Sequence, residues 1–273
     1  MARAATHRKK ASSTASKLLR TVAALLIVSI GAIDTPAHST PTHAMPSTKA
    51  VFFTSGIQQR LESAIRADDP AAIAELLSGG GAQANARGLR DVTPLMIAVD
   101  AQSPRAVAAL LNARANPNLR AVDGAGAVHL AVENHAVSPN GHAILEMIMK
   151  GGGDPNTRRP DNDPVIMRFV YDHDLDDLRW FKSLGADVDI PARTSRPLIA
   201  DAAFAQNWDG VWCLIELGAQ YDYEDTLYPL SEALDSSYAS SPDALLYPYK
   251  MKVWQLLKDK GLLRKPMKRF NPS

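Results

Sequence analysis

Cysteine is almost absent from this sequence, and so are long apolar runs. Cys213 is the only cysteine among 273 residues, which excludes a disulfide framework. The uncharged run at 21–33 would rise about 20 Å as a helix, too short for a bilayer core of about 30 Å, and no other segment approaches the required length. A phosphate-binding glycine loop is also absent, because the Gly-Gly-Gly runs at 79–81 and 151–153 follow apolar helices and act as helix terminators.

The first 37 residues have the pattern of an export signal. Six basic residues and no acidic one precede the apolar run, and small residues follow it. We therefore predict a signal peptide over residues 1–37, cut after Ala37 or Ala44, and a periplasmic protein, since export with so little cysteine fits a bacterial periplasm. Two alternatives stay open. An uncleaved leader would tether the chain to the inner membrane, and a start at Met45 would leave it in the cytosol.

The chain that remains after cleavage is acidic. Removal of residues 1–37 changes the formal charge from +1 to −4, with 24 basic and 28 acidic residues left. Residues 38–56 begin rich in Pro, Ser and Thr without an apolar period and predict a flexible linker, and residues 264–273 predict a solvated basic tail. We expect no nucleic-acid binding, because the chain is acidic and exported and its basic residues are not interleaved with aromatic ones.

A short phrase that ends in Asn or Asp returns five times along the chain. Its copies lie at 81–85, 114–118, 153–156, 185–189 and 218–222, and their last residues are 33, 38, 33 and 33 positions apart. Before each copy, apolar residues three and four apart predict a helix, and the Gly that starts most copies predicts the end of that helix. A shorter helix precedes it, opened most clearly by Thr93 and Pro94. A period near 33 predicts a stacked array of helix pairs.

The sequence TPLMIA at 93–98, combined with LLSGGGAQAN at 76–85 and the 33-residue period, resembles the ankyrin repeat over residues 57–263. The resemblance implies an all-α ankyrin-repeat solenoid of about six helix pairs with short hairpin fingers. The first and last pairs are expected to act as caps, since residues 57–66 lack the TPLH start of a standard repeat. The resemblance also implies that a partner protein binds to the concave face formed by the fingers and the first helices.

The predicted fingers at 86–92, 119–125, 157–162 and 190–195 are rich in arginine, whereas the finger at 223–227 is acidic. The expected partner-binding residues are Arg87, Arg90, Arg120, Arg158, Arg159, Arg193, Arg196 and Phe204, with Tyr171 and Trp208 as further aromatic anchors. Arginine forms paired hydrogen bonds with carboxylates, so we expect a partner protein with an acidic surface. The alternative, that these charges only keep the fingers soluble, stays open.

The residues that could carry chemistry have structural interpretations. Cys213 is expected to be a packed thiol on a second helix, and the resemblance assigns local hydrogen bonding to His129, at the histidine position of TPLH. His135 and His142 lack the Cys or carboxylate companions of a zinc site. The segment 172–177 lacks the glycine and glutamate of a calcium loop and predicts a turn. We therefore expect no enzyme activity, cofactor, metal site or small-molecule substrate.

These features favour a non-enzymatic binding protein of the bacterial periplasm that holds one partner protein. The exported bacterial ankyrin-repeat proteins that this chain resembles include immunity proteins, which neutralise toxins, and proteins that protect a periplasmic enzyme such as catalase. A toxin-neutralising role is the favoured hypothesis. A protective or scaffold protein for a periplasmic enzyme, and an envelope-tethered structural scaffold, are the alternatives.

Overall fold

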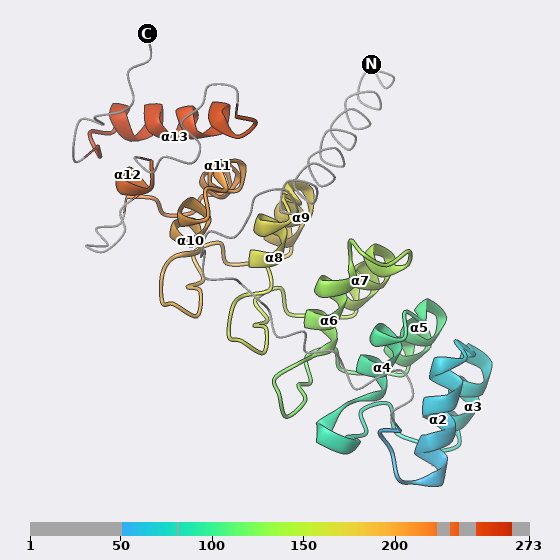
Figure 1. Cartoon of the computed structure of the whole chain (residues 1–273). Coiled ribbons are helices and arrows are strands. Elements are labelled where there is room, and N and C mark those ends of the chain that lie inside the picture. Colours follow the sequence, from blue (N-terminus) through green and yellow to red (C-terminus); the bar gives the residue numbers. More distant parts are fainter. Residues whose placement is uncertain (1–50, 81, 223–229, 235–243, 264–273) are drawn as a thin grey trace, which may run out of the picture. The chain divides into compact units, whose positions relative to one another are not determined.

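The computed structural model describes residues 51–80, 82–222, 230–234 and 244–263. The predicted signal peptide, residues 38–50 of the predicted linker and the predicted C-terminal tail lie outside these residues. The regular structure of the described part consists of twelve α-helices and one short 3-10 helix, with three isolated β-bridges in the loops (Figure 1). None of the described helices is long and apolar enough to cross a membrane. The all-α prediction is confirmed.

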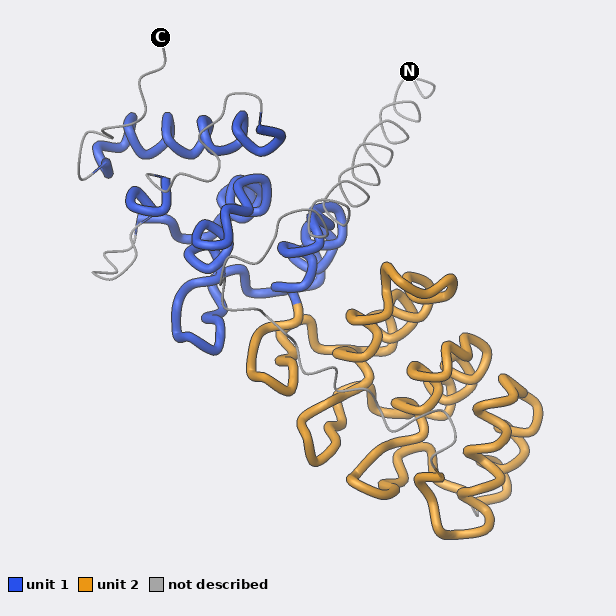
Figure 2. Tube along the Cα trace, viewed as in Figure 1, with its two compact units in different colours: residues 1–38, 166–273 blue, residues 39–165 orange. Residues whose placement is uncertain are grey.

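The helices fall into two compact units, shown in Figure 2. Unit 2 spans residues 39–165 and contains α2 (Gly56–Arg66), α3 (Pro70–Ser78), α4 (Pro94–Asp100), α5 (Pro104–Asn112), α6 (Ala127–Asn134), α7 (Gly141–Lys150) and the 3-10 helix η1 (Leu89–Asp91). Unit 1 spans residues 1–38 and 166–273 and contains α8 (Met167–Tyr171), α9 (Leu175–Ser183), α10 (Leu198–Phe204), α11 (Trp208–Glu216), α12 (Leu230–Ala233) and α13 (Tyr247–Asp259). The described residues thus contain the six predicted helix pairs.

Helices in equivalent places of neighbouring pairs pack on one another. In unit 2, the first helices α2, α4 and α6 pack in that order, as do the second helices α3, α5 and α7. In unit 1, α10 packs on α8 and α12, and α13 packs on α11. The facing sides in unit 2 are apolar, with Leu61, Ile73, Leu95, Leu110 and Ile144 almost completely buried. A single pair has no such core of its own, so each pair depends on its neighbours for stability.

The helices begin where the sequence signals predict. The Thr93 Oγ1 accepts a hydrogen bond from the backbone N–H of Met96 at 3.3 Å, and Pro94 occupies the first helical position of α4. In α3, the Asp69 carboxylate caps the helix directly before Pro70. A capping side chain followed by proline therefore starts both a first helix of a pair, α4, and a second helix, α3.

Each second helix is followed by a residue in the left-handed backbone conformation. The φ angles lie between 62° and 98° at Gly80, Arg114, Gly152, Gly185, Gly218 and Gly261. Glycine adopts this region without the steric cost that a Cβ brings. This requirement explains the glycine that starts the phrase at Gly185 and Gly218 and the glycine directly before it at Gly80 and Gly152. Arg114 is the one position of the set where a side chain accepts the strain.

The asparagine that ends the repeated phrase joins consecutive helix pairs. The Nδ2 of Asn118 donates to the carbonyl oxygen of Gly152 at 2.9 Å, and its Oδ1 accepts a hydrogen bond from the backbone N–H of Asp154 at 2.8 Å. Asn85 makes the same two bonds to the phrase at 114–118, at 3.1 and 2.7 Å. One side-chain amide therefore satisfies an acceptor and a donor of the next phrase, which gives a physical reason for its recurrence.

The last residues of the linker predicted for 38–56 are packed, which corrects that prediction. Phe52 and Phe53 are 3% and 5% exposed. The carbonyl oxygen of Phe52 accepts a hydrogen bond from the backbone N–H of Leu89 at 2.7 Å. Gly88 allows this approach, because a Cβ there would lie 2.6 Å from the same carbonyl oxygen. Two phenyl side chains bury enough apolar surface to hold the segment against the first helix pair and the first finger.

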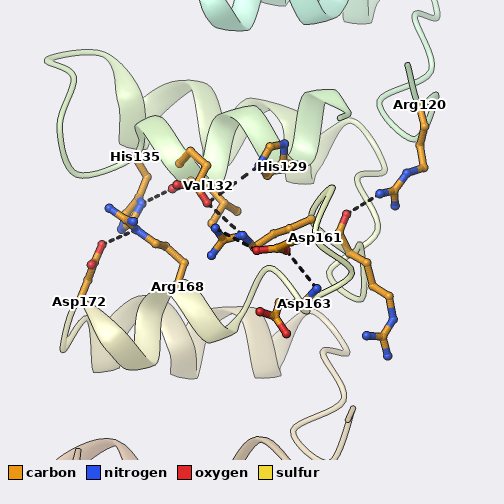
Figure 3. A network of polar contacts seen from close by, with 11 residues as sticks. Arg120, His129, Val132, His135, Asp161, Asp163, Arg168 and Asp172 are labelled. Carbon is orange, nitrogen blue, oxygen red and sulfur yellow. Dashed lines mark hydrogen bonds and ion pairs between the residues drawn. The ribbon is translucent and has the colours of Figure 1, made fainter. Parts of the chain in front are cut away.

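A polar cluster lies inside unit 2 around His129 (Figure 3). His129 is 6% exposed, its Nε2 lies 4.0 Å from the Glu133 carboxylate, and Arg159 lies 3.6 Å from the same carboxylate. The buried Nδ1 of His129 has no hydrogen-bond partner among the described residues, so the local bond implied by the resemblance is not formed at this atom. Burial, helped by the positive charge of Arg159, lowers the pKa of His129 to about 4.

Replacement of Asn118 by alanine should weaken the junction between the second and third helix pairs. Loss of its two hydrogen bonds is expected to lower the free energy of unfolding by about 1–2 kcal/mol, as measured by urea unfolding followed by circular dichroism. Asn112→Ala, at the exposed end of α5, is the matched control and should change stability by less than about 0.5 kcal/mol. Equal losses in the two variants would contradict the role assigned to Asn118.

The stability of the protein should decrease in mild acid because of His129. The folded state holds this imidazole neutral down to a pKa of about 4, whereas the unfolded chain protonates it near pH 6.5. The free energy of unfolding should therefore fall by about 2 kcal/mol between pH 7 and pH 5 from this group, as measured by urea unfolding at both pH values. His129→Gln should remove most of that fall. His142→Gln, at a side chain that is 54% exposed, is the control. A His129→Gln variant with the pH dependence of the wild type would refute the assignment.

Candidate partner-binding surface

The fingers of unit 2 are tight hairpins with the same internal bond. A backbone N–H donates to the carbonyl oxygen four residues later in each of them: Gly88 to Val92 at 2.9 Å, Ala121 to Ala125 at 2.8 Å and Arg159 to Asp163 at 2.7 Å. The tips turn through residues with left-handed φ angles, among them Arg90, Gly124 and Asn162. Repetition of one geometry places equivalent side chains of successive fingers in register.

Three of the predicted site residues connect one finger to the next or brace their own finger. The Nη1 of Arg87 donates to the carbonyl oxygen of Arg120 at 3.1 Å. The Nη2 of Arg120, drawn in Figure 3, donates to the carbonyl oxygen of Arg158 at 2.7 Å. The Nη1 of Arg158 donates to the carbonyl oxygen of Asn162, in its own finger, at 2.6 Å. These arginines stand 33 and 38 residues apart, the same steps as the repeated phrase. Each guanidinium is therefore held in place, while five N–H donors per side chain leave others for a ligand.

Arg90 lies at the tip of the first finger with a side chain that is 57% exposed. One guanidinium nitrogen lies 3.5 Å from the carboxylate of Asp123 on the second finger. The carbonyl oxygen of Arg90 also accepts a hydrogen bond from the backbone N–H of Val122 at 2.9 Å. Backbone and side chain of Arg90 thus both connect the first two fingers, and the side chain remains accessible.

Arg159 takes a different direction from its neighbour Arg158. Its side chain is only 13% exposed and lies 3.6 Å from the carboxylates of Glu133 and Asp161. Successive side chains of extended backbone point to opposite sides, which accounts for the different directions of Arg158 and Arg159. The structure therefore places Arg159 in the polar cluster around His129, away from the exposed finger surface.

Two exposed apolar side chains that were not among the predicted site residues accompany the arginines. Leu89 is 65% exposed and Val122 is 69% exposed, and they occupy equivalent positions on the first and second fingers. Their spacing of 33 residues was visible in the sequence. Charge and aromatic character, on which the predicted site residues were chosen, do not distinguish these two aliphatic residues. The surface of unit 2 consequently combines fixed guanidinium groups with apolar side chains.

The site residues of unit 1 form a separate set. Arg193 is exposed. Arg196 lies 3.4 Å from the buried carboxylate of Asp201, and its guanidinium lies over the Phe204 ring at 5.5 Å. Phe204 is 58% exposed and so remains a candidate contact residue. The acidic finger predicted at 223–227 lies outside the described residues.

Trp208 is not a surface anchor, and that prediction is wrong. It is completely buried at the first position of α11. Its Nε1 donates to the Oε1 of Gln206 at 3.1 Å, and the ammonium group of Lys250 lies 5.4 Å from its ring centroid. The long helix α13, which packs on α11, covers it. Tyr171, the other proposed anchor, is partly buried.

Cys213, one of the residues considered for chemistry, is buried as expected, and this burial raises the pKa of its thiol to about 11, so the thiol stays protonated near neutral pH. The turn predicted for 172–177 covers only residues 172–174, because α9 begins at Leu175. The Asp172 carboxylate pairs with Arg168 at 2.7 Å. His173 in this turn contacts the Asp209 carboxylate at 2.9 Å.

Comparison with known proteins agrees with this architecture. Residues 90–122 match the family model of the ankyrin repeat, one period that contains α4 and α5. A search among curated proteins found no match. One similar solved structure is the ankyrin repeat domain of Bcl-3, described as a unique member of the IkappaB protein family, with a TM-score of 0.54 and 24% identity over 64% of this chain and 79% of that one. Another is the human ASB11 ankyrin repeat domain, with a TM-score of 0.51 and 21% identity over 78% and 86%.

At these identities the solved structures show a shared fold, and the family model adds a sequence match for the second helix pair. Ankyrin repeats are protein–protein interaction modules. The periodic phrase, the helix pairs with hairpin fingers and these matches together show that the chain contains an ankyrin repeat at 90–122 and has the ankyrin-repeat fold.

Proposed function

We propose that this protein is a non-enzymatic binding protein whose fingers in unit 2 hold one partner protein through an acidic surface. The observation that carries the proposal is the register of Arg87, Arg90 and Arg120 on two consecutive fingers, each in contact with the neighbouring finger. Guanidinium groups held in this way lose little side-chain freedom when a carboxylate binds, which reduces the entropic cost of association. Arginine also supplies the paired donors that match a carboxylate.

The apolar side chains beside the arginines support a protein partner. Leu89 and Val122 would lose water on contact with a partner, and this burial supplies the non-directional part of the affinity. The arginines would then select for acidic partners and speed their approach, an effect that salt weakens. A surface with both components is typical of protein interfaces, in which an apolar centre is bordered by polar groups.

The proposed location is the bacterial periplasm, on the strength of the signal peptide predicted for residues 1–37. In that compartment the partner would be a toxin, which makes this chain an immunity protein, or an enzyme such as catalase that the chain protects or scaffolds. Mass spectrometry of the mature N-terminus from fractionated cells tests the location. A chain that begins near His38 or Met45 in the periplasmic fraction is expected, and a chain that begins at Met1 or Ala2 in the membrane fraction would support an envelope-tethered scaffold instead.

A charge reversal confined to the first finger tests the binding surface. The Arg87→Glu/Arg90→Glu variant should recover at least about tenfold less of the partner from periplasmic extract than the wild type, because two charge-assisted contacts become repulsive. The matched control is Arg105→Glu/Lys150→Glu on the second helices α5 and α7. It has the same net charge and also breaks two ion pairs, with Asp68 and Glu146.

The control should recover the partner as the wild type does, and circular dichroism should show folded protein for both variants. Recovery by the first-finger variant at the wild-type level would remove the finger surface from the proposal. Loss of recovery in both variants to the same degree would show a dependence on net charge alone.

A further inference from the structure

A cleft in unit 2 lies between the second finger at 119–125 and the third finger at 157–162. Its volume is about 370 Å³, and the polar residues of its lining include Asn118, Arg120, Asp154, Thr157 and Arg158. These residues carry two positive charges, on Arg120 and Arg158, and one negative charge, on Asp154. The Oδ1 of Asp154 already accepts a hydrogen bond from the backbone N–H of Asn156 at 2.8 Å. The cleft is therefore positively charged overall, although the chain without its leader is acidic.

Arg120 differs in its charge partners from three other finger arginines of unit 2. Arg87 pairs with Asp91 at 3.5 Å, Arg90 with Asp123 at 3.5 Å, and Arg159 with two carboxylates at 3.6 Å. Arg120 has a backbone carbonyl as its hydrogen-bond partner and no carboxylate among the described residues. Its positive charge is thus fixed in position and not neutralised by an ion pair.

Gly124 lies directly against this arginine. A Cβ at this position would lie 3.4 Å from the Nη2 of Arg120 and 3.6 Å from the Cα of Pro160, which is ordinary van der Waals contact. The glycine is needed for its φ angle of +84°, a conformation that other residues rarely adopt. The turn at Gly124 thus brings the second finger close to the third while the Arg120 guanidinium lines the cleft.

We propose that this cleft receives the side chain of a glutamate or aspartate from an extended acidic segment of the partner protein. The carboxylate binds the remaining N–H donors of Arg120, with the Arg158 guanidinium and the Thr157 hydroxyl close by. This inference rests on the proposed function and names the chemical group that the finger surface recognises. Nucleic acid is a poorer occupant, because the lining contains no aromatic side chain on which a base could stack.

A synthetic peptide serves as the probe, with several Glu residues in a Gly-Ser host and a Gln peptide of the same length as its control. Binding is followed in the full-length protein by the ¹H–¹⁵N signals of the arginine Nε–H groups during titration. The Glu peptide should shift the Arg120 signal, and Arg120→Gln should weaken binding at least about tenfold, as expected for a charge-assisted hydrogen bond. Arg120→Lys, which keeps the charge and loses the paired donors, should give an intermediate affinity. Arg105→Gln on α5 is the matched control and should bind as the wild type does.

Several outcomes would overturn the inference. They are equal binding of the Glu and Gln peptides, no shift of the Arg120 signal, or wild-type affinity in Arg120→Gln. Free glutarate that shifts the signal as strongly as the peptide would show a small carboxylate as the ligand instead of a protein segment. A partner that is captured equally by wild type and Arg120→Gln, but lost by Arg87→Glu/Arg90→Glu, would refute the cleft and leave the proposed function intact.

Discussion

Each helix pair of this protein is too small to bury its own apolar face, and this constraint underlies the rest of the structure. A pair such as α4 and α5 becomes stable only when α2 and α3 cover one side and α6 and α7 cover the other. Covering requires the same helix to recur in the same place, so the chain repeats its helix starts, its left-handed helix ends and its loops at one interval. The packed segment at Phe52 and Phe53 solves the same problem at the first pair, where no earlier repeat is present among the described residues.

The polar contacts between pairs follow the same interval as the apolar ones. Loops that run between helices leave backbone carbonyls and N–H groups that need partners. The amides of Asn85 and Asn118 satisfy such groups in the next phrase, and the guanidiniums of Arg87 and Arg120 satisfy carbonyls in the next finger. In the proposed binding surface, these arginines would therefore serve both structure and recognition. The bond that ties one finger to the next also holds a cationic group where a partner can meet it.

Two neighbouring arginines show where sequence reasoning stops. Arg158 and Arg159 are chemically identical and adjacent, and a count of charges treats them alike. In the structure, Arg158 braces the third finger and lines the cleft, whereas Arg159 enters the polar cluster near His129 and Glu133. Trp208 gives a similar lesson, because its burial depends on α13, which begins 39 residues later in the chain. Neither outcome can be derived from the residues adjacent to these side chains.

The sequence by itself determined the number of helix pairs, the places where helices start and stop, and the positions of the fingers. These features depend on caps, prolines, left-handed residues and apolar spacing, all of which act within about one turn of the chain. Only the tertiary structure decided which arginines face solvent, that Arg120 has no carboxylate partner among the described residues, and that Phe52 belongs to the packed core. Most of these facts depend on residues far away in the chain, and they emerge when neighbouring pairs bring such distant groups into contact.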